Sequence, residues 1–115
     1  MMGREKVGVL GVARDALEVL GGQIRIARIE RGWTQKHLGS VCGASERTIS
    51  MIERGHPSVA IGNVLNAAVS VGVPLFQLDD PEELARIRHR GEERIALIPK
   101  RVAAQQEVPL ELRDF

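Results

Sequence analysis

The stretch Thr34–Gly55, TQKHLGSVCGASERTISMIERG, constrains the fold of this chain more than any other part of it. Thr34 can cap a helix, because its hydroxyl can accept a hydrogen bond from one of the unpaired N–H groups of the first turn. Gly43 lies where the chain must reverse, and glycine adopts positive φ at little cost. Ser45 can then cap a second helix. The stretch therefore predicts two short helices joined by a tight turn.

The second of these helices is expected to be amphipathic. Ile49 and Ile52 are three residues apart, so they share one face, which should be buried together with Leu38 of the first helix. Gly55 follows the last turn, where glycine commonly ends a helix. The opposite face carries side chains that are free to contact a ligand: Arg47, Thr48, Ser50 and Met51.

This pattern resembles the helix-turn-helix of the phage-repressor-like DNA-binding family, the Cro/C1 or XRE type. The resemblance spans roughly residues 20–78 and implies an all-α fold, a five-helix phage-repressor-like DNA-binding domain. An αα-hairpin used only for packing is the alternative, and DNA binding is the better interpretation. The matching features are the helix beginning at Gln35, the small Gly39, the turn at Gly43, Ile49, Ile52 and the closing Ile-Glu-Arg-Gly.

The resemblance also implies roles for individual residues. The second helix would enter a major groove of DNA while the first crosses the phosphate backbone. Arg47 is the best candidate to bind a guanine with two hydrogen bonds, and Gln35 would bond a phosphate or a nearby base edge. Glu46 could accept from a cytosine amine or stabilise the helix start, and we prefer the second. The expected DNA-binding residues are Gln35, Ser45, Glu46, Arg47, Thr48, Ser50, Met51 and Arg54.

Two residues are expected to be structural instead. In the family, an Arg at the position of Arg28 pairs with the Glu near the end of the recognition helix, here Glu53. Removing one partner of a buried pair costs ~3–5 kcal/mol, because the other charge is left uncompensated.

The family more often carries a basic or polar residue where Glu46 and Met51 stand, so its base preference does not transfer to this chain.

Charge is unevenly distributed along the 115 residues. Residues 1–78 hold nine Lys/Arg and six Asp/Glu, a net charge of +3, whereas residues 79–115 hold seven and nine, a net charge of −2. The basic excess lies on the part that resembles a DNA binder, as phosphate neutralisation requires.

A single cysteine excludes an intrachain disulfide, and no apolar run approaches the ~20 residues of a membrane span. We therefore expect a cytoplasmic protein.

The first helix is predicted from periodicity. Residues 1–12 are expected to be a flexible N-terminus, and Leu17, Leu20 and Ile24 predict a helix from residue 13 onward. Gly21-Gly22 weakens this helix by roughly 1 kcal/mol per glycine. We therefore expect either a bend there or a short leading helix before the main one.

Two more helices should complete a DNA-binding domain of residues 13–78. Ser58 is the expected cap of a fourth helix, which Gly72 would stop. A short fifth helix should run from Val73-Pro74 to about Leu78. The buried face of the fourth helix is expected to hold Ile61, Leu65, Ala68 and Val69.

An additional C-terminal helix is predicted over residues 79–98, with Asp80 as its cap and Pro81 at its first position. Its apolar stripe needs a partner, because such a helix is marginal in isolation. The partner could be its own domain or a second copy of the chain, so this helix is a candidate dimerisation element. The stripe consists of Leu84, Ile87, Gly91, Ile95 and Ile98.

Residues 99–115 are expected to form an extended tail that ends in Leu110, Leu112 and Phe115. A terminal aromatic beside leucines can fill the pocket of a partner protein. The alternative is that Phe115 folds back onto its own domain.

The whole-chain layout resembles the HipB-type antitoxins. The resemblance rests on ALEVLGGQIRIAR near the start, PSVAIG after the recognition helix, and the C-terminal part that runs from IPKRV to LRDF. It implies an autoregulating homodimer that binds its own double-stranded operator DNA and holds a HipA-type Ser/Thr kinase toxin inactive. The alternatives are a stand-alone phage-type or metabolic repressor, and an interaction adaptor that does not bind DNA.

Other chemistry is not indicated by the sequence. The three histidines and the cysteine lack the spacing of a zinc site. Neither a P-loop nor a dinucleotide-binding glycine motif occurs. We therefore expect a non-enzyme that uses no cofactor and no metal.

Overall fold

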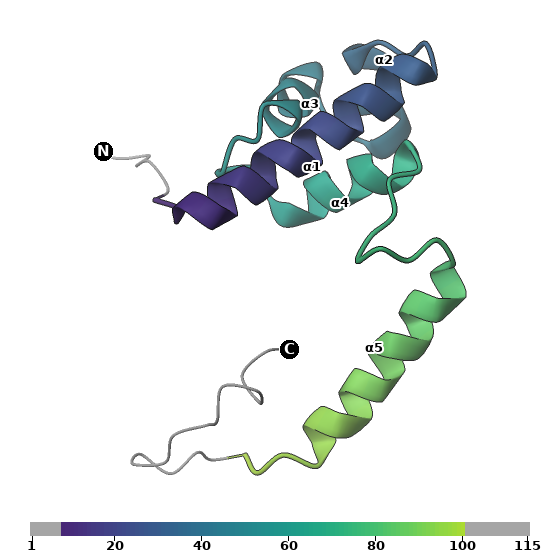
Figure 1. Ribbon diagram of the computed structural model, residues 1–115. Helices are drawn as coiled ribbons and strands as arrows, with labels where there is room; N and C mark the ends of the chain where they lie inside the picture. Colours follow the sequence, from purple (N-terminus) through teal and green to yellow (C-terminus); the bar gives the residue numbers. More distant parts are fainter. Residues whose placement is uncertain (1–7, 101–115) are drawn as a thin grey trace. The chain divides into compact units, whose positions relative to one another are not determined.

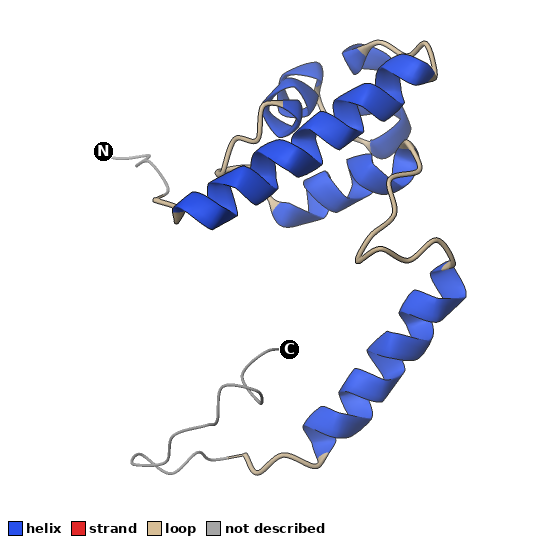
Figure 2. Cartoon of the chain, in the orientation of Figure 1, coloured by secondary structure: helices blue, strands red, loops and turns tan. Residues whose placement is uncertain are grey.

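A computed structural model describes residues 8–100 of the chain. It contains α1 (Gly11–Glu30), α2 (Gln35–Cys42), α3 (Glu46–Glu53), α4 (Ile61–Ser70) and α5 (Pro81–Ala96), as Figure 1 shows. None of these residues is drawn as a strand in Figure 2. An isolated β-bridge joins Leu75 and Leu78. The predicted all-helical class is confirmed. The chain divides into two compact units, residues 1–79 and residues 80–115.

The first helix departs from the prediction in two ways. It begins at Gly11, earlier than expected, so the last two residues of the supposed flexible N-terminus are helical. It also runs without a break through Gly21-Gly22. A Cβ on Gly21 would meet the carbonyl oxygen of Ile52 and lie 2.8 Å from that of Glu53. Gly21 is therefore present because α3 packs against α1 at this point.

The turn between α2 and α3 follows from local signals. Thr34 Oγ1 accepts a hydrogen bond from the His37 N–H at 3.0 Å and starts α2. Gly43 ends α2 in the left-handed conformation, with φ of 77°. A Cβ on Gly39 would meet the carbonyl oxygen of Ala44, so this glycine admits the backbone of the turn. The backbone of the turn thereby passes close to α2 at Gly39.

The core of the first unit collects buried side chains from α1 to α4 and the residue that follows α4. Helix α2 packs against α3 and α4, and α1 packs against the same two helices. Each fully buried Leu or Ile contributes about 1.5–3 kcal/mol relative to an exposed position. The buried apolar residues are Ile24, Leu38, Ile49, Ile52, Ala67, Ala68 and Val71. This core holds α3 by one face and leaves its other face outside.

The fourth helix begins later than predicted. Its cap is Ala60, which forms no side-chain cap bond, and Ser58 instead bonds the His56 ring in the preceding turn. The expected buried face was wrong in part, because Ile61 and Val69 are 74% and 63% exposed. Ala67 and Ala68 are the residues of α4 that are fully buried in the core, and their small side chains allow α4 to lie close to the neighbouring helices.

The short fifth helix predicted over residues 73–78 is not formed. Leu75 and Leu78 instead flank a tight turn, and the Leu78 N–H donates to the Leu75 carbonyl at 3.0 Å. Phe76 and Gln77 occupy this turn with φ of 54° and 62°. Two consecutive left-handed residues are incompatible with a right-handed helix, so the chain reverses here instead of coiling.

The second unit is described as far as Lys100. Asp80 caps α5 by accepting from the Glu82 N–H at 2.9 Å, and Pro81 takes the first position. The helix ends at Ala96, slightly before the predicted residue 98, and none of its residues is buried. The tail residues Leu110, Leu112 and Phe115 lie outside the described residues.

Candidate nucleic-acid interface

Helix α3 has two contrasting faces. Ile49, Ile52 and Glu53 are buried against the core. The residues on the other side are exposed or half-buried, and they comprise the expected recognition set Ser45, Glu46, Arg47, Thr48, Ser50, Met51 and Arg54. These side chains therefore lie together along one helix, whose opposite face is buried against the core.

The start of α3 is fixed by its own side chains. Ser45 Oγ accepts from the Thr48 N–H at 3.0 Å and donates to Thr48 Oγ1 at 2.9 Å. The proton of the Ser45 hydroxyl and one of its two lone pairs are thus used at the helix start. Thr48 keeps its own hydroxyl proton for another acceptor. Glu46, in the exposed first turn, has a position where a carboxylate stabilises the helix through the partial positive charge of that end.

Arg47 is the basic residue in the first turn of α3. Its side chain is exposed, and within residues 8–100 it takes part in no hydrogen bond or ion pair. An unpaired guanidinium has five N–H donors in a planar fork, which matches guanine O6 and N7 or a phosphate. Ser50 and Met51 lie one turn further along the same helix, both half-buried.

A buried network fixes the back of the motif. Arg28 Nε donates to Glu53 Oε2 at 2.6 Å, and Arg28 Nη2 donates to Glu53 Oε1 at 3.0 Å. Arg28 Nη1 also donates to the Trp33 carbonyl at 2.7 Å. Both residues of the pair are 8% exposed. The network ties α1, the loop before α2, and the end of α3 into one body.

Gln35 joins this network. Its Nε2 donates to Glu53 Oε1 at 3.1 Å, and the residue is half-buried at the first position of α2. The predicted phosphate or base contact therefore has to share the amide group with Glu53. The amide has two N–H donors and one carbonyl acceptor, so one donor and the acceptor stay available. Glu53 orients the Gln35 side chain before any ligand arrives.

The end of α3 adds residues that the sequence did not single out. Arg54 Nε donates to the Ser50 carbonyl at 3.3 Å. Around Arg54, a surface depression is also lined by Arg14 of α1 and His56 of the following turn. Two arginines, a histidine and the acidic Glu18 thus line one depression where α1 passes the end of α3. Gly55 packs closely against Glu18 there, a contact between distant residues that no local sequence pattern indicates.

Other kinds of site are not found in the part of the chain that is described. Among residues 8–100, no three His, Cys, Asp or Glu side chains gather in an arrangement that could hold a metal ion. No helix described there has the length and apolarity needed to cross a membrane. Cys42 is a half-buried free thiol that packs against the core.

Comparison with known proteins agrees with this geometry. A helix-turn-helix family model matches residues 24–78, which contain α2, α3 and α4 and the last part of α1. This segment is similar to that family, and the match ends at Leu78, one residue before the end of the first unit.

A curated relative is the "Neisseria hypothetical transcription factor" of Neisseria meningitidis serogroup B (strain ATCC BAA-335 / MC58). It is 32% identical over 65 residues, which cover 56% of this chain and 61% of the relative. The chain thus spans about three fifths of the length of that relative. No solved structure matches the chain significantly.

Proposed function

We propose that this chain is a sequence-specific DNA-binding transcriptional repressor. The observation that carries the proposal is the state of α3: one face is locked in the core, and the other presents Arg47 without an intramolecular partner among the described residues. A helix held in this way can enter a major groove without rearrangement. The helix-turn-helix match over residues 24–78 and the similarity to a hypothetical transcription factor support the same proposal.

Base reading is assigned mainly to Arg47, with Thr48, Ser50 and Met51 as further contacts. Arg47 lies in the first turn of α3, the part of a recognition helix that reaches base edges. A bidentate contact to guanine is worth about 1–3 kcal/mol of discrimination. Met51 is suited to the methyl group of a thymine. Glu46 remains a helix-start residue in this proposal.

Phosphate contacts would flank this reading helix. Gln35, oriented by Glu53, stands at the start of α2 beside the unpaired N–H groups of its first turn. Arg54 and Arg14 offer two cationic groups at the far end of α3, where His56 lines the same depression. Such contacts position a protein on DNA without specifying its sequence.

The protein is proposed to act as a homodimer. One α3 reaches too few base pairs for selective binding, and two-fold dimers of this motif bind half-sites about one helical turn, ~34 Å, apart. The expected operator is therefore a pseudo-palindrome in the DNA upstream of its own gene.

The test is a fluorescence-anisotropy titration of the full chain with that upstream DNA. A shuffled duplex of the same length and composition is the control, at one fixed salt concentration. We expect binding to the upstream DNA to be at least about a thousandfold tighter, as is typical of specific regulators. Equal affinity for both duplexes, or none for either, would favour a protein-binding adaptor.

A finer proposal is that the repressor is a HipB-type antitoxin. Its support is the layout of the sequence, including the apolar ending of the tail in Leu110, Leu112 and Phe115. In this proposal the dimer holds a HipA-type kinase inactive, and the tail fills a pocket of the kinase at high effective concentration. A repressor without a toxin partner is the alternative.

Deleting residues 108–115 tests the finer proposal. Operator binding by the free dimer should stay nearly unchanged, while binding and inhibition of a kinase encoded beside the gene should weaken. The matched control is a chain with Leu110, Leu112 and Phe115 changed to Ser at full length. A loss of thermal stability or of DNA binding, with kinase binding intact, would make the tail a structural element instead.

A further inference from the structure

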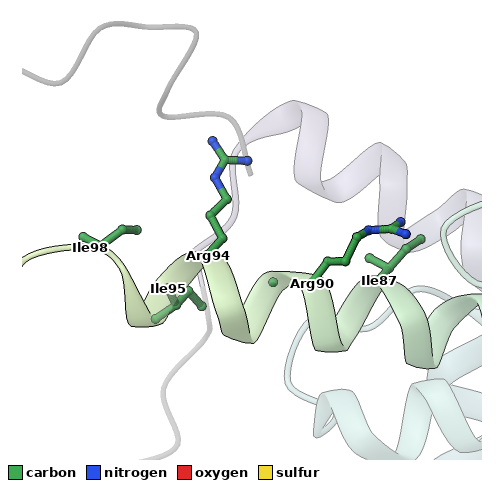
Figure 3. A pocket seen from close by; sticks show the side chains of 6 residues that line it. Ile87, Arg90, Arg94, Ile95 and Ile98 are labelled. Carbon is green, nitrogen blue, oxygen red and sulfur yellow. The ribbon is translucent and has the colours of Figure 1, made fainter.

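Helix α5 carries an apolar stripe that no other part of residues 80–100 covers. No residue of the helix is buried, and Ile87 and Ile95 are 42% and 68% exposed. Together with Gly91 and Ile98 they line a shallow groove, bordered by Arg90 and Arg94 (Figure 3). A helix of 16 residues is marginal when isolated, and most of its stability must come from packing of its apolar face. The stripe therefore needs an occupant.

We infer that the occupant is α5 of a second copy of the chain, packed antiparallel and crossing at Gly91. The inference rests on the proposed dimer and states where that dimer forms. Its first support is the symmetry of the stripe. Leu84 and Ile98 are equally distant from Gly91 in sequence, and so are Ile87 and Ile95. In an antiparallel pair centred on Gly91, Ile87 faces Ile95 of the second copy within the two helices, and Leu84 faces Ile98, which lies just beyond the end of α5. A two-fold contact requires such a self-complementary surface.

The glycine itself is the second support. An added Cβ at Gly91 would meet nothing within 4 Å, so residues 80–100 give no packing reason for a glycine there. Glycine in a helix interior costs about 1 kcal/mol relative to alanine. At the centre of a two-helix crossing, its small size would let the two backbones approach closely. Gly91 is then the counterpart of Gly21, whose missing side chain makes room for α3.

Charge along the helix is the third support, and it selects the orientation. Residues 79–87 hold four acidic and one basic side chain, a net charge of −3, whereas residues 88–100 hold four basic and two acidic ones, a net charge of +2. An antiparallel pair places the acidic end of each helix beside the basic end of the other. A parallel pair would place like ends together. Complementary charges of this kind fix register and orientation in helix pairs.

The first experiment is sedimentation equilibrium on the full chain carrying Ile87→Asp and Ile95→Asp. The matched control carries Ala85→Asp and Ala96→Asp, which add the same charge to the same helix away from the stripe. We expect the dimer dissociation constant to rise at least about tenfold for the stripe variant and by less than threefold for the control. Equal effects in both, or a dimer that survives in the stripe variant, would overturn the assignment to α5.

The second experiment tests orientation by disulfide formation in a Cys42→Ala background. Chains with Leu84→Cys and chains with Ile98→Cys are oxidised separately and as a mixture. Antiparallel packing predicts a mixed disulfide between the two kinds of chain and little self-linking of either. Preferential self-linking of the Leu84→Cys chain would show a parallel pair and contradict the proposal.

The outcomes separate this inference from the proposed function. If the stripe variant stays dimeric and binds the upstream DNA, the inference fails and the proposed function stands. If the unmodified chain is monomeric both free and on DNA, the dimer fails in both. If deletion of residues 101–115 converts a monomer into a dimer, the chain's own tail covers the stripe and the inference is wrong.

Discussion

Helices α3 and α5 start from similar sequence signals and end in opposite situations. Each has a side-chain cap, an acidic first turn and an apolar stripe. Helix α3 is the shorter, with 8 residues, yet three of them are buried, whereas α5 has 16 residues and none is buried. Caps and periodicity therefore indicate where a helix forms. Only the neighbouring helices decide whether its stripe becomes core, as in α3, or is left for a partner, as we infer for α5.

The largest effect is expected from breaking the buried pair behind α3. Glu53→Ala should lower the free energy of unfolding by about 3–5 kcal/mol, because Arg28 then keeps a buried charge without a partner. Denaturant unfolding followed by the fluorescence of Trp33, the single tryptophan, measures it within the first unit. Replacing both partners, Arg28→Met with Glu53→Leu, should restore much of the loss. A loss below 1 kcal/mol in Glu53→Ala would mean that the pair is not closed in solution.

The paired glycines of α1 give the next largest effect and an internal control. Gly21→Ala should destabilise the first unit by about 1–3 kcal/mol, since the new Cβ would press on backbone carbonyls of α3. Gly22→Ala should instead stabilise it by about 0.5–1 kcal/mol, because a Cβ there meets nothing within 4 Å and alanine favours the helix. The same unfolding assay reports both. Effects of the same sign would contradict the packing of α1 on α3.

The smallest effect belongs to the exposed pair of α5. Arg88 Nη1 donates to Glu92 Oε2 at 2.8 Å, but both side chains are more than half exposed. Glu92→Ala should therefore change stability by no more than about 0.5 kcal/mol. Thermal unfolding followed by circular dichroism, which also reports α5, is the measurement. A change comparable with that of Glu53→Ala would remove the contrast between the two regions.

Local signals predicted much of the fold and of the candidate site. The caps Thr34, Ser45 and Asp80 and the reversal at Gly43 all occur where the sequence indicated. These features depend on a few neighbouring residues and on backbone geometry, so one sequence suffices to find them. The face of α3 followed in the same way, because the spacing of Ile49 and Ile52 fixes which side is buried.

What the sequence did not reveal depends on contacts between distant residues. Gly21-Gly22 suggested a bend, yet α1 is continuous, because the glycine accommodates α3 and not a kink. Val69 fits the predicted apolar stripe of α4, yet its side chain is exposed, because the neighbouring helices cover only part of the apolar surface of α4. A turn at Phe76 and Gln77 forms in place of the predicted helix. Both residues have positive φ values, which their residue types do not indicate. Arg14 and His56 line a depression together with Arg54 because α1 packs on the end of α3.

The central claim is that the exposed face of α3 reads DNA sequence, and Arg47→Ala tests it most directly. The affinity of the full chain for its upstream DNA and for a shuffled duplex is measured at one salt concentration, with Arg86→Ala, an exposed arginine on the side of α5 away from the stripe, as the control for lost charge. We predict a loss of about 1–3 kcal/mol on the upstream DNA and a much smaller one on the shuffled duplex, with little change for Arg86→Ala. Equal losses on the two duplexes would reduce Arg47 to a phosphate contact, and no loss on either would contradict the claim that α3 reads the operator.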